Sequence, residues 1–262
     1  MVTRTTTADS NAIVSLAFWL DLRRYGAMLN EARFDPTCPE AKAALGRLRR
    51  FQEVVAAHSR TTFPTLVIND GVVAYRDVGL TVTDRVWPFV ERCWKLYQET
   101  TDADRRLGGH GLRGVLAAGM RAKGSNRGIL AQNDAVARII GDLADGRISR
   151  REAVGAAWRV RRVNDIVPQL QANFAFSRAY TAEQGARKGK LEGSRFYLET
   201  KVLRAGVPGW LTTGDPIEWE PSVDWLSTLS TTFVEVQAVA ESPDRETAFR
   251  TGREMLASLR MD

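Results

Sequence analysis

One segment, residues 65–75, constrains the fold more than any other part of the chain. It reads TLVINDGVVAY, two β-rich runs on either side of Asn69, Asp70 and Gly71. Asn-Gly and Asp-Gly sequences between such runs favour the tight turn of a β-hairpin. The segment therefore predicts an antiparallel pair of strands with a carboxylate at its turn.

The remaining apolar patterns predict strands and helices in mixed order. An unbroken apolar strand at 14–20 ends on Asp21. The other predicted elements are helices at 22–33, 40–57 and 83–104, a strand at 112–120 that turns at Gly119 and continues through Lys123, a helical region at 128–169 with a break at 145–146, a helix at 173–183, a strand at 196–203, a loop-like tail at 206–221, a strand or helix at 223–240, and a terminal helix at 244–259. This order predicts an α+β fold, an antiparallel-rich sheet with helices packed on one face.

The domain organisation follows from the same patterns. Residues 1–11 are Thr-rich and polar, and we expect a disordered N-terminus there. Residues 12–262 are expected to form a single domain with a helical insertion at about 128–169 and a C-terminal elaboration at about 206–262. No apolar run approaches the ~20 residues of a membrane span, and the N-terminus does not resemble a signal peptide, so a cytoplasmic protein without membrane partners is expected.

Composition restricts the chemistry that the chain can perform. The 262 residues include only two histidines, His58 and His110, and two cysteines, Cys38 and Cys93. A zinc site of His and Cys ligands is therefore excluded, and a His-centred triad has few candidates. The remaining options are carboxylates, amides, arginines and a hard metal ion.

The chain is basic, with 37 Lys and Arg against 31 Asp and Glu, a net charge of +6. A basic surface suits a polyanion, which could be nucleic acid or a nucleoside triphosphate. The arginines concentrate at 47–50, 147–151 and 159–162, all within helical patterns, where a solvated helix face explains them as well. Charge alone does not choose between these partners.

Asp21 and Asp70 are the candidate metal ligands. Asp21 ends a buried strand, and Asp70 lies at the tip of a hairpin that is expected beside that strand. Two carboxylates at ~4 Å repel by about 4 kcal/mol at an effective dielectric of ~20, so such a pair calls for a cation. Together with the backbone carbonyl of Leu22 they would form an oxygen-only site suited to Mg²⁺ or Mn²⁺. A second interpretation stays open, in which Asp70 is a turn residue and Asp21 a helix N-cap.

Four segments resemble class III nucleotidyl cyclases. FWLDLRRYGAM, residues 18–28, resembles the first-strand motif that closes on a metal-binding Asp, and residues 65–74 resemble the hairpin that carries the second. LRGVLAAGM, residues 112–120, is similar to the strand after the third helix. ANFAFSRAYTAE, residues 172–183, is similar to the later helix as it appears in Pycsar pyrimidine cyclases of bacterial antiphage defence. The resemblance spans roughly residues 14–203 and implies a ferredoxin-like βαββαβ core.

The resemblance also implies roles for individual residues. Asp21 and Asp70, with the Leu22 carbonyl, would hold two Mg²⁺ or Mn²⁺ ions. The turn of Leu22, Arg23, Arg24 and Tyr25 would wrap the triphosphate, and Lys201 is a further candidate for substrate binding. Asn173 and Arg178 would stabilise the ribose and the migrating phosphoryl charge across a homodimer interface, since Arg is a forked donor for phosphate oxygens and Asn can orient a sugar oxygen.

The sequence departs from the cyclase pattern at two places. Asn173 and Arg178 are five residues apart instead of four, which turns Arg178 about 100° away from the Asn face. Three interpretations of Arg178 stay open: it reaches round from an altered helix, it is replaced by Arg121, Lys123 or Lys201, or it is a surface charge. Residues 65–67, Thr-Leu-Val, occupy the place where purine cyclases often carry a charged base-reading residue, and this favours UTP or CTP as substrate.

These observations predict a pyrimidine nucleotidyl cyclase that acts as a homodimer and whose product activates a separate effector. One alternative is a catalytically degenerate cyclase fold that binds a nucleotide or a protein partner. A second is a nucleic-acid-binding protein that uses its arginine-rich helices, an interpretation that the resemblance disfavours.

Overall fold

The computed structural model describes residues 12–81, 83–122, 127–160 and 167–260. The predictions for residues 1–11 and for Lys123 lie outside this part of the chain. Two compact units make up the chain. One runs up to Arg121 and resumes at Asn173, and the other is Ala122–Ala172. Each unit is described by itself below.

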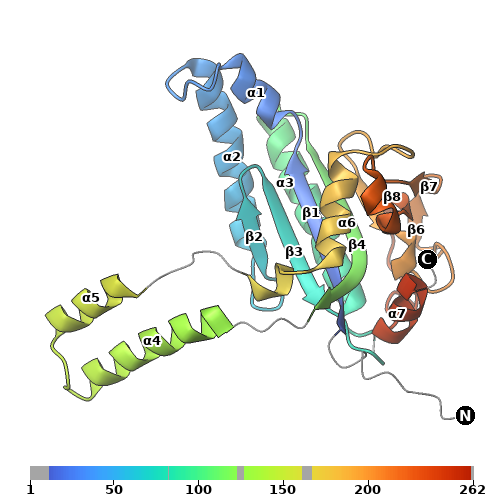
Figure 1. The fold of residues 1–262 in the computed structure, drawn as a ribbon. Coiled ribbons are helices and arrows are strands. Elements are labelled where there is room, and N and C mark those ends of the chain that lie inside the picture. The colour runs from blue at the N-terminus through green and yellow to red at the C-terminus, as the bar shows by residue number, and fades with distance from the viewer. Residues whose placement is uncertain (1–11, 82, 123–126, 161–166, 261–262) are drawn as a thin grey trace, which may run out of the picture. The chain divides into compact units, whose positions relative to one another are not determined.

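The larger unit is built on one eight-stranded sheet (Figure 1). Its strands are β1 (Ala12–Leu22), β2 (Thr65–Ile68), β3 (Gly71–Asp77), β4 (Leu112–Ala122), β5 (Phe196–Glu199), β6 (Leu211–Thr213), β7 (Ile217–Trp219) and β8 (Thr231–Val239). Its α-helices are α1 (Tyr25–Glu31), α2 (Pro39–His58), α3 (Val86–Arg106), α6 (Phe174–Gln184) and α7 (Gly252–Arg260), and its 3₁₀ helices are η3 (Thr200–Val202) and η4 (Asp224–Leu229). The strand order is β2-β3-β1-β4-β5-β8-β6, with β7 also paired to β8. β4 and β5 pair in parallel, whereas β1–β3, β2–β3 and the pairs that β8 forms with β5, β6 and β7 are antiparallel.

The predicted hairpin is confirmed, as is the α+β fold with a mostly antiparallel sheet. β2 and β3 pair around the Asn69–Asp70 turn, and β3 pairs antiparallel with β1. In this register Asp21 lies opposite Gly71. The turn itself depends on Asn69, whose φ of 54° lies in the left-handed region that asparagine tolerates better than most residues.

Several predicted boundaries were wrong. β4 runs unbroken through Gly119, and β5 ends at Glu199 because η3 follows it. The tail at 206–221 contains β6 and β7, each of three residues, too short for a periodic pattern. Within 223–240, η4 precedes β8. The terminal helix begins at Gly252, because the preceding segment instead places buried Phe249 in the core, where Phe249 forms a bridge with Leu203.

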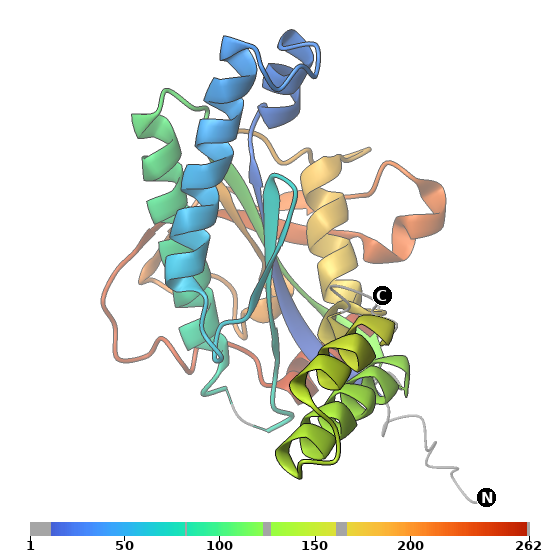
Figure 2. The ribbon, with the colours of Figure 1, turned by 90° about the vertical axis from the view of Figure 1, so that its left-hand side faces the viewer.

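The strands present different residues to the two faces of the sheet. Side chains alternate along a strand, so the buried Leu16, Phe18 and Leu20 of β1 face the core beneath α2 and α3. Trp19 and Asp21 face the opposite side, which carries α6. Figure 2 shows α2 and α3 on one side of the strands and α6 on the other.

Gly119 of β4 allows α6 to lie directly on the sheet. A Cβ atom at this position would be 2.3 Å from the backbone nitrogen of Ala175. No side chain other than hydrogen leaves room for the helix backbone there. This glycine therefore sets the distance between α6 and β4.

The smaller unit contains α4 (Arg127–Ala144), α5 (Arg150–Arg159) and the short 3₁₀ helix η2 (Pro168–Leu170). The break predicted at 145–146 separates α4 from α5. Ser149 and Glu152 form a capping box, which explains why α5 begins at Arg150. Among the described helices, none has the length and apolar character needed to cross a membrane.

Candidate active site

The structure brings Asp21 and Asp70 to one end of the sheet. Asp21 is the next-to-last residue of β1 and pairs with Gly71 of β3. The Leu22 amide donates a hydrogen bond of 3.1 Å to the backbone oxygen of Asp70. The Asn69 side chain donates to Asp70 Oδ1 at 2.9 Å. The strand end and the hairpin turn therefore fix the two acidic residues beside each other.

The two carboxyl groups are held in an environment that disfavours negative charge. Burial raises the pKa of Asp21 to about 8, and the charges of Glu183 and Asp70 add to this effect, while Arg113 opposes it. Burial also raises the pKa of Asp70. A cation at this position would offset both the cost of burying the negative charges and their mutual repulsion, because its positive charge attracts each carboxylate.

Glu183 is a third acidic residue near this pair, and it was not among the predicted site residues. It lies at the end of α6, is 7% exposed, and accepts a hydrogen bond of 2.8 Å from the Gln184 side chain. Arg113 Nη1 of β4 is 3.6 Å from Glu183 Oε1. Burial raises the pKa of Glu183, and the Arg113 charge lowers it. Nothing local in the sequence marks Glu183, since its position depends on how α6 packs on the sheet.

The donor set fits a hard divalent cation. Mg²⁺ is commonly held by one or two carboxylates and completes its shell with water and phosphate oxygens. Asp21 and Asp70 supply the two carboxylates, and Leu22 lies directly after Asp21 at the end of β1. Within the described residues, no cluster of three or more His, Cys, Asp or Glu side chains has metal-binding geometry. The phosphate oxygens of a bound nucleotide would have to complete the coordination.

The turn after β1 is held by hydrogen bonds on both sides of the Arg23 residue. The Arg23 amide donates to Gly111 O at 3.1 Å, and the Arg23 carbonyl accepts from Arg47 Nη2 at 3.2 Å. Arg24 is exposed and adopts the left-handed conformation, with φ of 60°. Tyr25 is buried, and its pKa is raised by burial and then by the nearby charge of Asp70. The turn and the acidic pair are therefore neighbours, as the resemblance implied.

Trp19 supports the hairpin turn from the same face of β1. A Cβ atom on Gly71 would lie 2.3 Å from the Trp19 ring, so the indole packs directly against the Gly71 backbone. Trp19 also contacts Tyr180 of α6, with ring centroids 5.2 Å apart in an edge-to-face arrangement. Gly71 is thus required because of the neighbouring ring.

Asn173 lies at the other end of the same sheet face. Its side-chain oxygen accepts from the Phe176 amide at 3.1 Å as the N-cap of α6, and its amide nitrogen donates to Ser15 Oγ at 3.2 Å. Ser15 precedes Asp21 by six residues of extended strand, about 20 Å. Asn173 and the acidic pair therefore do not meet within one chain.

Arg178 is buried in a network inside the chain. Its guanidinium donates to Ala118 O at 2.7 Å, to Leu229 O at 3.1 Å and to Glu199 Oε1 at 3.2 Å. Glu199 in turn accepts from the Ala118 amide at 2.6 Å. The interpretation of Arg178 as an exposed surface charge was wrong, since the residue is 5% exposed. Its catalytic role stays a prediction.

Arg121 and Lys201, two other cations considered for that role, make their contacts away from the acidic pair. Arg121 forms an ion pair of 2.6 Å with Asp77. Burial lowers the pKa of Lys201, and the neighbouring charge of Arg178 lowers it further. Lys201 therefore lies close to Arg178, and its role in substrate binding stays a prediction.

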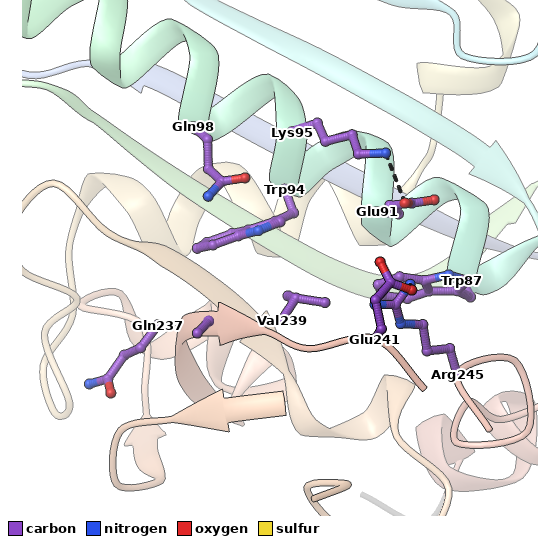
Figure 3. A pocket seen from close by; sticks show the side chains of 10 residues that line it. Trp87, Glu91, Trp94, Lys95, Gln98, Gln237, Val239, Glu241 and Arg245 are labelled. Carbon is purple, nitrogen blue, oxygen red and sulfur yellow. Dashed lines mark hydrogen bonds and ion pairs between the residues drawn. The ribbon is translucent and has the colours of Figure 1, made fainter. Parts of the chain in front are cut away.

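A separate cavity lies between α3 and β8 (Figure 3). It has a volume of about 370 Å³ and is lined by side chains that include Trp87 and Trp94. Its charged groups pair with one another, Glu91 with Lys95 at 2.8 Å and Glu241 with Arg245 at 2.9 Å. None of the predicted site residues lines it, so we do not assign it to the active site.

Comparisons with known proteins identify the fold. No protein-family model and no curated protein matches the sequence. The structure is similar to that of the guanylyl cyclase Cya2, with 11% identity over 89% of this chain and 96% of that chain, and a TM-score of 0.50. Weaker likenesses are to the guanylate cyclase domain of RhGC from Catenaria anguillulae in complex with GTP (10% identity, 88% and 100% coverage, TM-score 0.44) and to the adenylyl cyclase CyaB from P. aeruginosa (10%, 89% and 97%, 0.35). The chain thus has the fold of a class III nucleotidyl cyclase domain.

Proposed function

We propose that this protein is a nucleotidyl cyclase that converts UTP or CTP into its 3′,5′-cyclic monophosphate and pyrophosphate. The observation that carries the proposal is the convergence of Asp21 and Asp70 at one end of a cyclase-type sheet. Burial raises the pKa of both carboxyl groups, and a bound cation would offset the cost of their negative charge. Two such acidic residues beside a basic turn suit a metal-bound triphosphate.

In this proposal the chain orients the nucleotide for an in-line displacement. Two Mg²⁺ or Mn²⁺ ions, held by Asp21, Asp70 and the Leu22 carbonyl, would neutralise phosphate charge and lower the pKa of the 3′-hydroxyl. The turn from Leu22 to Tyr25, with Arg23 and Arg24, would hold the triphosphate. The 3′-oxygen loses its proton to solvent and bonds to the α-phosphorus, while the bond from that phosphorus to the bridging oxygen breaks and pyrophosphate leaves.

The site would be completed by a second copy of the chain. Asn173 lies about 20 Å from Asp21 along β1, too far to act on the same nucleotide. A homodimer in which α6 of one protomer faces the acidic pair of the other would bring Asn173, Arg178 and Lys201 to the ribose and phosphates. The cyclase resemblance supports this arrangement.

The pyrimidine preference rests on β2. Thr65, Leu66 and Val67 offer no charged group at the place where purine cyclases often read the base. The similarity of residues 172–183 to Pycsar cyclases further suggests that the product is a second messenger in antiphage defence, which would activate a separate effector protein in the cytoplasm.

The experiment is a turnover assay with each of the four nucleoside triphosphates and Mn²⁺, read by chromatography. The wild-type chain is expected to form a cyclic product from UTP or CTP. Asp21→Asn and Asp70→Asn should each reduce turnover by at least ~10³-fold, while the exposed control Asp102→Asn should match the wild type. Unchanged product formation by either site variant would refute the assignment.

One observation favours a second candidate function, a nucleotide-binding protein without turnover. The Arg178 guanidinium makes three hydrogen bonds within its own chain, and a group so engaged must break contacts before it can reach a phosphate. This candidate predicts that the wild type binds a triphosphate and releases no product. The same assay, combined with calorimetric binding, separates the two functions.

A further inference from the structure

A buried ion pair lies behind the turn that follows β1. Arg47 of α2 makes a bidentate contact with Asp104 of α3, with Nε–Oδ1 at 2.7 Å and Nη2–Oδ2 at 2.9 Å. Both side chains are 3% exposed. Neither residue is among the predicted site residues, and the proposed chemistry uses neither of them.

Arg47 and Asp104 each extend to the backbone around the turn. Arg47 also donates to the Arg23 carbonyl at 3.2 Å and to the Met28 sulfur at 2.9 Å. Asp104 Oδ2 accepts from the Gly111 amide at 2.8 Å, and the Gly111 carbonyl accepts from the Arg23 amide at 3.1 Å. These bonds form a closed ring that holds Arg23 by both its N–H and its C=O.

The loop before β4 is shaped to fit this ring. A Cβ atom on Gly109 would lie 2.1 Å from Asp104 Oδ2. Gly111 has φ of 72°, and a Cβ atom there would lie 2.1 Å from Ser194 Oγ. Glycine at 109 therefore leaves room for the Asp104 carboxylate, and glycine at 111 adopts the positive φ and the close approach to Ser194 that accompany the bond from its amide to Asp104.

Stability alone does not explain such a pair. Removing two charges from water is costly, and apolar residues of similar size often stabilise a protein as well as a buried ion pair does. An apolar pair could not, however, hold the Arg23 carbonyl and the Gly111 amide. The contacts that distinguish Arg47 and Asp104 from apolar residues are those directed at the turn.

We propose that Arg47 and Asp104 are positioning residues, which fix the backbone of residues 22–25 so that the turn is ready to receive a triphosphate. This inference rests on the proposed function for the identity of the ligand. The geometric part, that the ion pair holds the turn, can be measured without turnover.

Arg47→Lys is the informative variant. Lysine can keep one contact with Asp104, but its single ammonium group cannot also reproduce the bonds to Arg23 and Met28. We expect KM for the triphosphate to rise about tenfold or more with kcat within about twofold, because the turn would bind substrate less well while the acidic pair is unchanged. Hydrogen exchange at residues 22–28 should accelerate.

Tyr97→Phe is the matched control, since it removes a partly buried hydrogen bond of 2.8 Å to Ser194 O and none of the bonds in the ring around Arg23. It should change neither KM nor exchange at residues 22–28. Asp104→Asn, which keeps the size of the side chain and removes its charge, should reproduce the effect of Arg47→Lys. If Arg47→Lys folds and shows normal exchange or a normal KM, the positioning role is wrong.

A wild type that turns over none of the four triphosphates would overturn the proposed function separately. The dissociation constant of the triphosphate with Mn²⁺ then replaces KM, and it is expected to rise about tenfold in Arg47→Lys. A wild type that binds no triphosphate would overturn the positioning proposal as well.

Discussion

Asp21 and Asp70 show how a strand end and a turn concentrate like charges. The backbone bond from Leu22 to Asp70 O fixes the two residues together, so they cannot separate to relieve repulsion. Burial adds to the cost and raises the pKa of Asp21 to about 8. Residues with such perturbed pKa values and a specific charged neighbour are typical of functional sites.

Asp21→Asn should stabilise the metal-free protein increasingly as the pH rises. The folded-state pKa of about 8 lies above the ordinary value of 3.8, so the folded protein holds this proton more tightly and loses stability between pH 4 and pH 8. Asparagine does not ionise, so the variant does not lose this stability as the pH rises. The difference in unfolding free energy between variant and wild type should reach about 1–3 kcal/mol at pH 8.

Urea denaturation at pH 5, 6, 7 and 8 in the presence of EDTA measures this effect. The variant should approach the wild type in stability at the acidic end of the series. Saturating Mn²⁺ should reverse the order at pH 8, because the cation binds the wild-type carboxylate. A stability difference that stays constant with pH would contradict this account.

Gly71→Ala tests the contact between Trp19 and the hairpin turn. The added methyl group would overlap the buried indole ring, so either the ring or the turn must move. We expect a loss of about 1–3 kcal/mol in unfolding free energy, together with weaker Mn²⁺ binding. The double variant Gly71→Ala/Trp19→Phe should recover part of both losses, as measured by thermal unfolding and by titration with the metal; no recovery would argue against direct overlap.

At the scale of elements, α6 joins the two ends of the sheet face. Its N-cap, Asn173, bonds to Ser15 near the start of β1, and Glu183 in its last turn lies near Asp21 at the end of β1. The helix can lie so close to the strands only because Gly119 has no side chain. Displacing α6 should therefore disturb both ends of the face together.

Gly119→Ala is expected to destabilise the protein by about 1–3 kcal/mol, since its methyl group would meet the backbone of α6. The control is Gly46→Ala in α2, where a Cβ atom meets nothing within 4 Å. That substitution should stabilise the helix by about 0.5–1 kcal/mol. Thermal unfolding of the two variants measures both effects, and equal melting temperatures would show that the contact with α6 is looser than the structure indicates.

At the scale of the whole molecule, the proposed site requires residues that one chain cannot bring together. Asn173 and the acidic pair are about 20 Å apart along β1, a distance fixed by the extended strand. A symmetric dimer has two such sites, each with the acidic pair of one protomer and α6 of the other. Inactive variants from opposite sides of the site should therefore complement each other.

An equal mixture of Asp21→Asn and Asn173→Ser tests this arrangement. Serine keeps the N-cap of α6 but removes the amide, so the helix should remain intact. Each variant alone should be inactive, and the mixture should recover about a quarter of wild-type activity, since half of the dimers keep one of two sites. Denaturing and refolding the mixture ensures exchange of subunits; no recovery in a confirmed heterodimer would contradict the shared site.

The parts of the fold that the sequence predicts are those encoded by neighbouring residues. The hairpin follows from Asn69, Asp70 and Gly71, the strand before Asp21 from its unbroken apolar run, and the break between α4 and α5 from Asp145 and Gly146. The three-residue strands β6 and β7 were missed because they acquire strand geometry only by pairing with β8. Phe249 likewise makes the terminal helix begin later than predicted, at Gly252, because it enters the core.

The sequence by itself placed the two members of the acidic pair, Asp21 at a strand end and Asp70 in a turn, because both are local features. The pairing of β1 with β3, which sets Asp21 opposite Gly71, joins segments far apart in the sequence and was decided by the tertiary structure. Only the tertiary structure could decide which distant groups surround that pair. Glu183 reaches it from 162 residues away along the chain, and Arg47 and Asp104 hold the adjoining turn from separate helices. Such positions depend on how helices pack on the sheet, and packing follows from the shape of the whole core, which no local pattern of residues encodes.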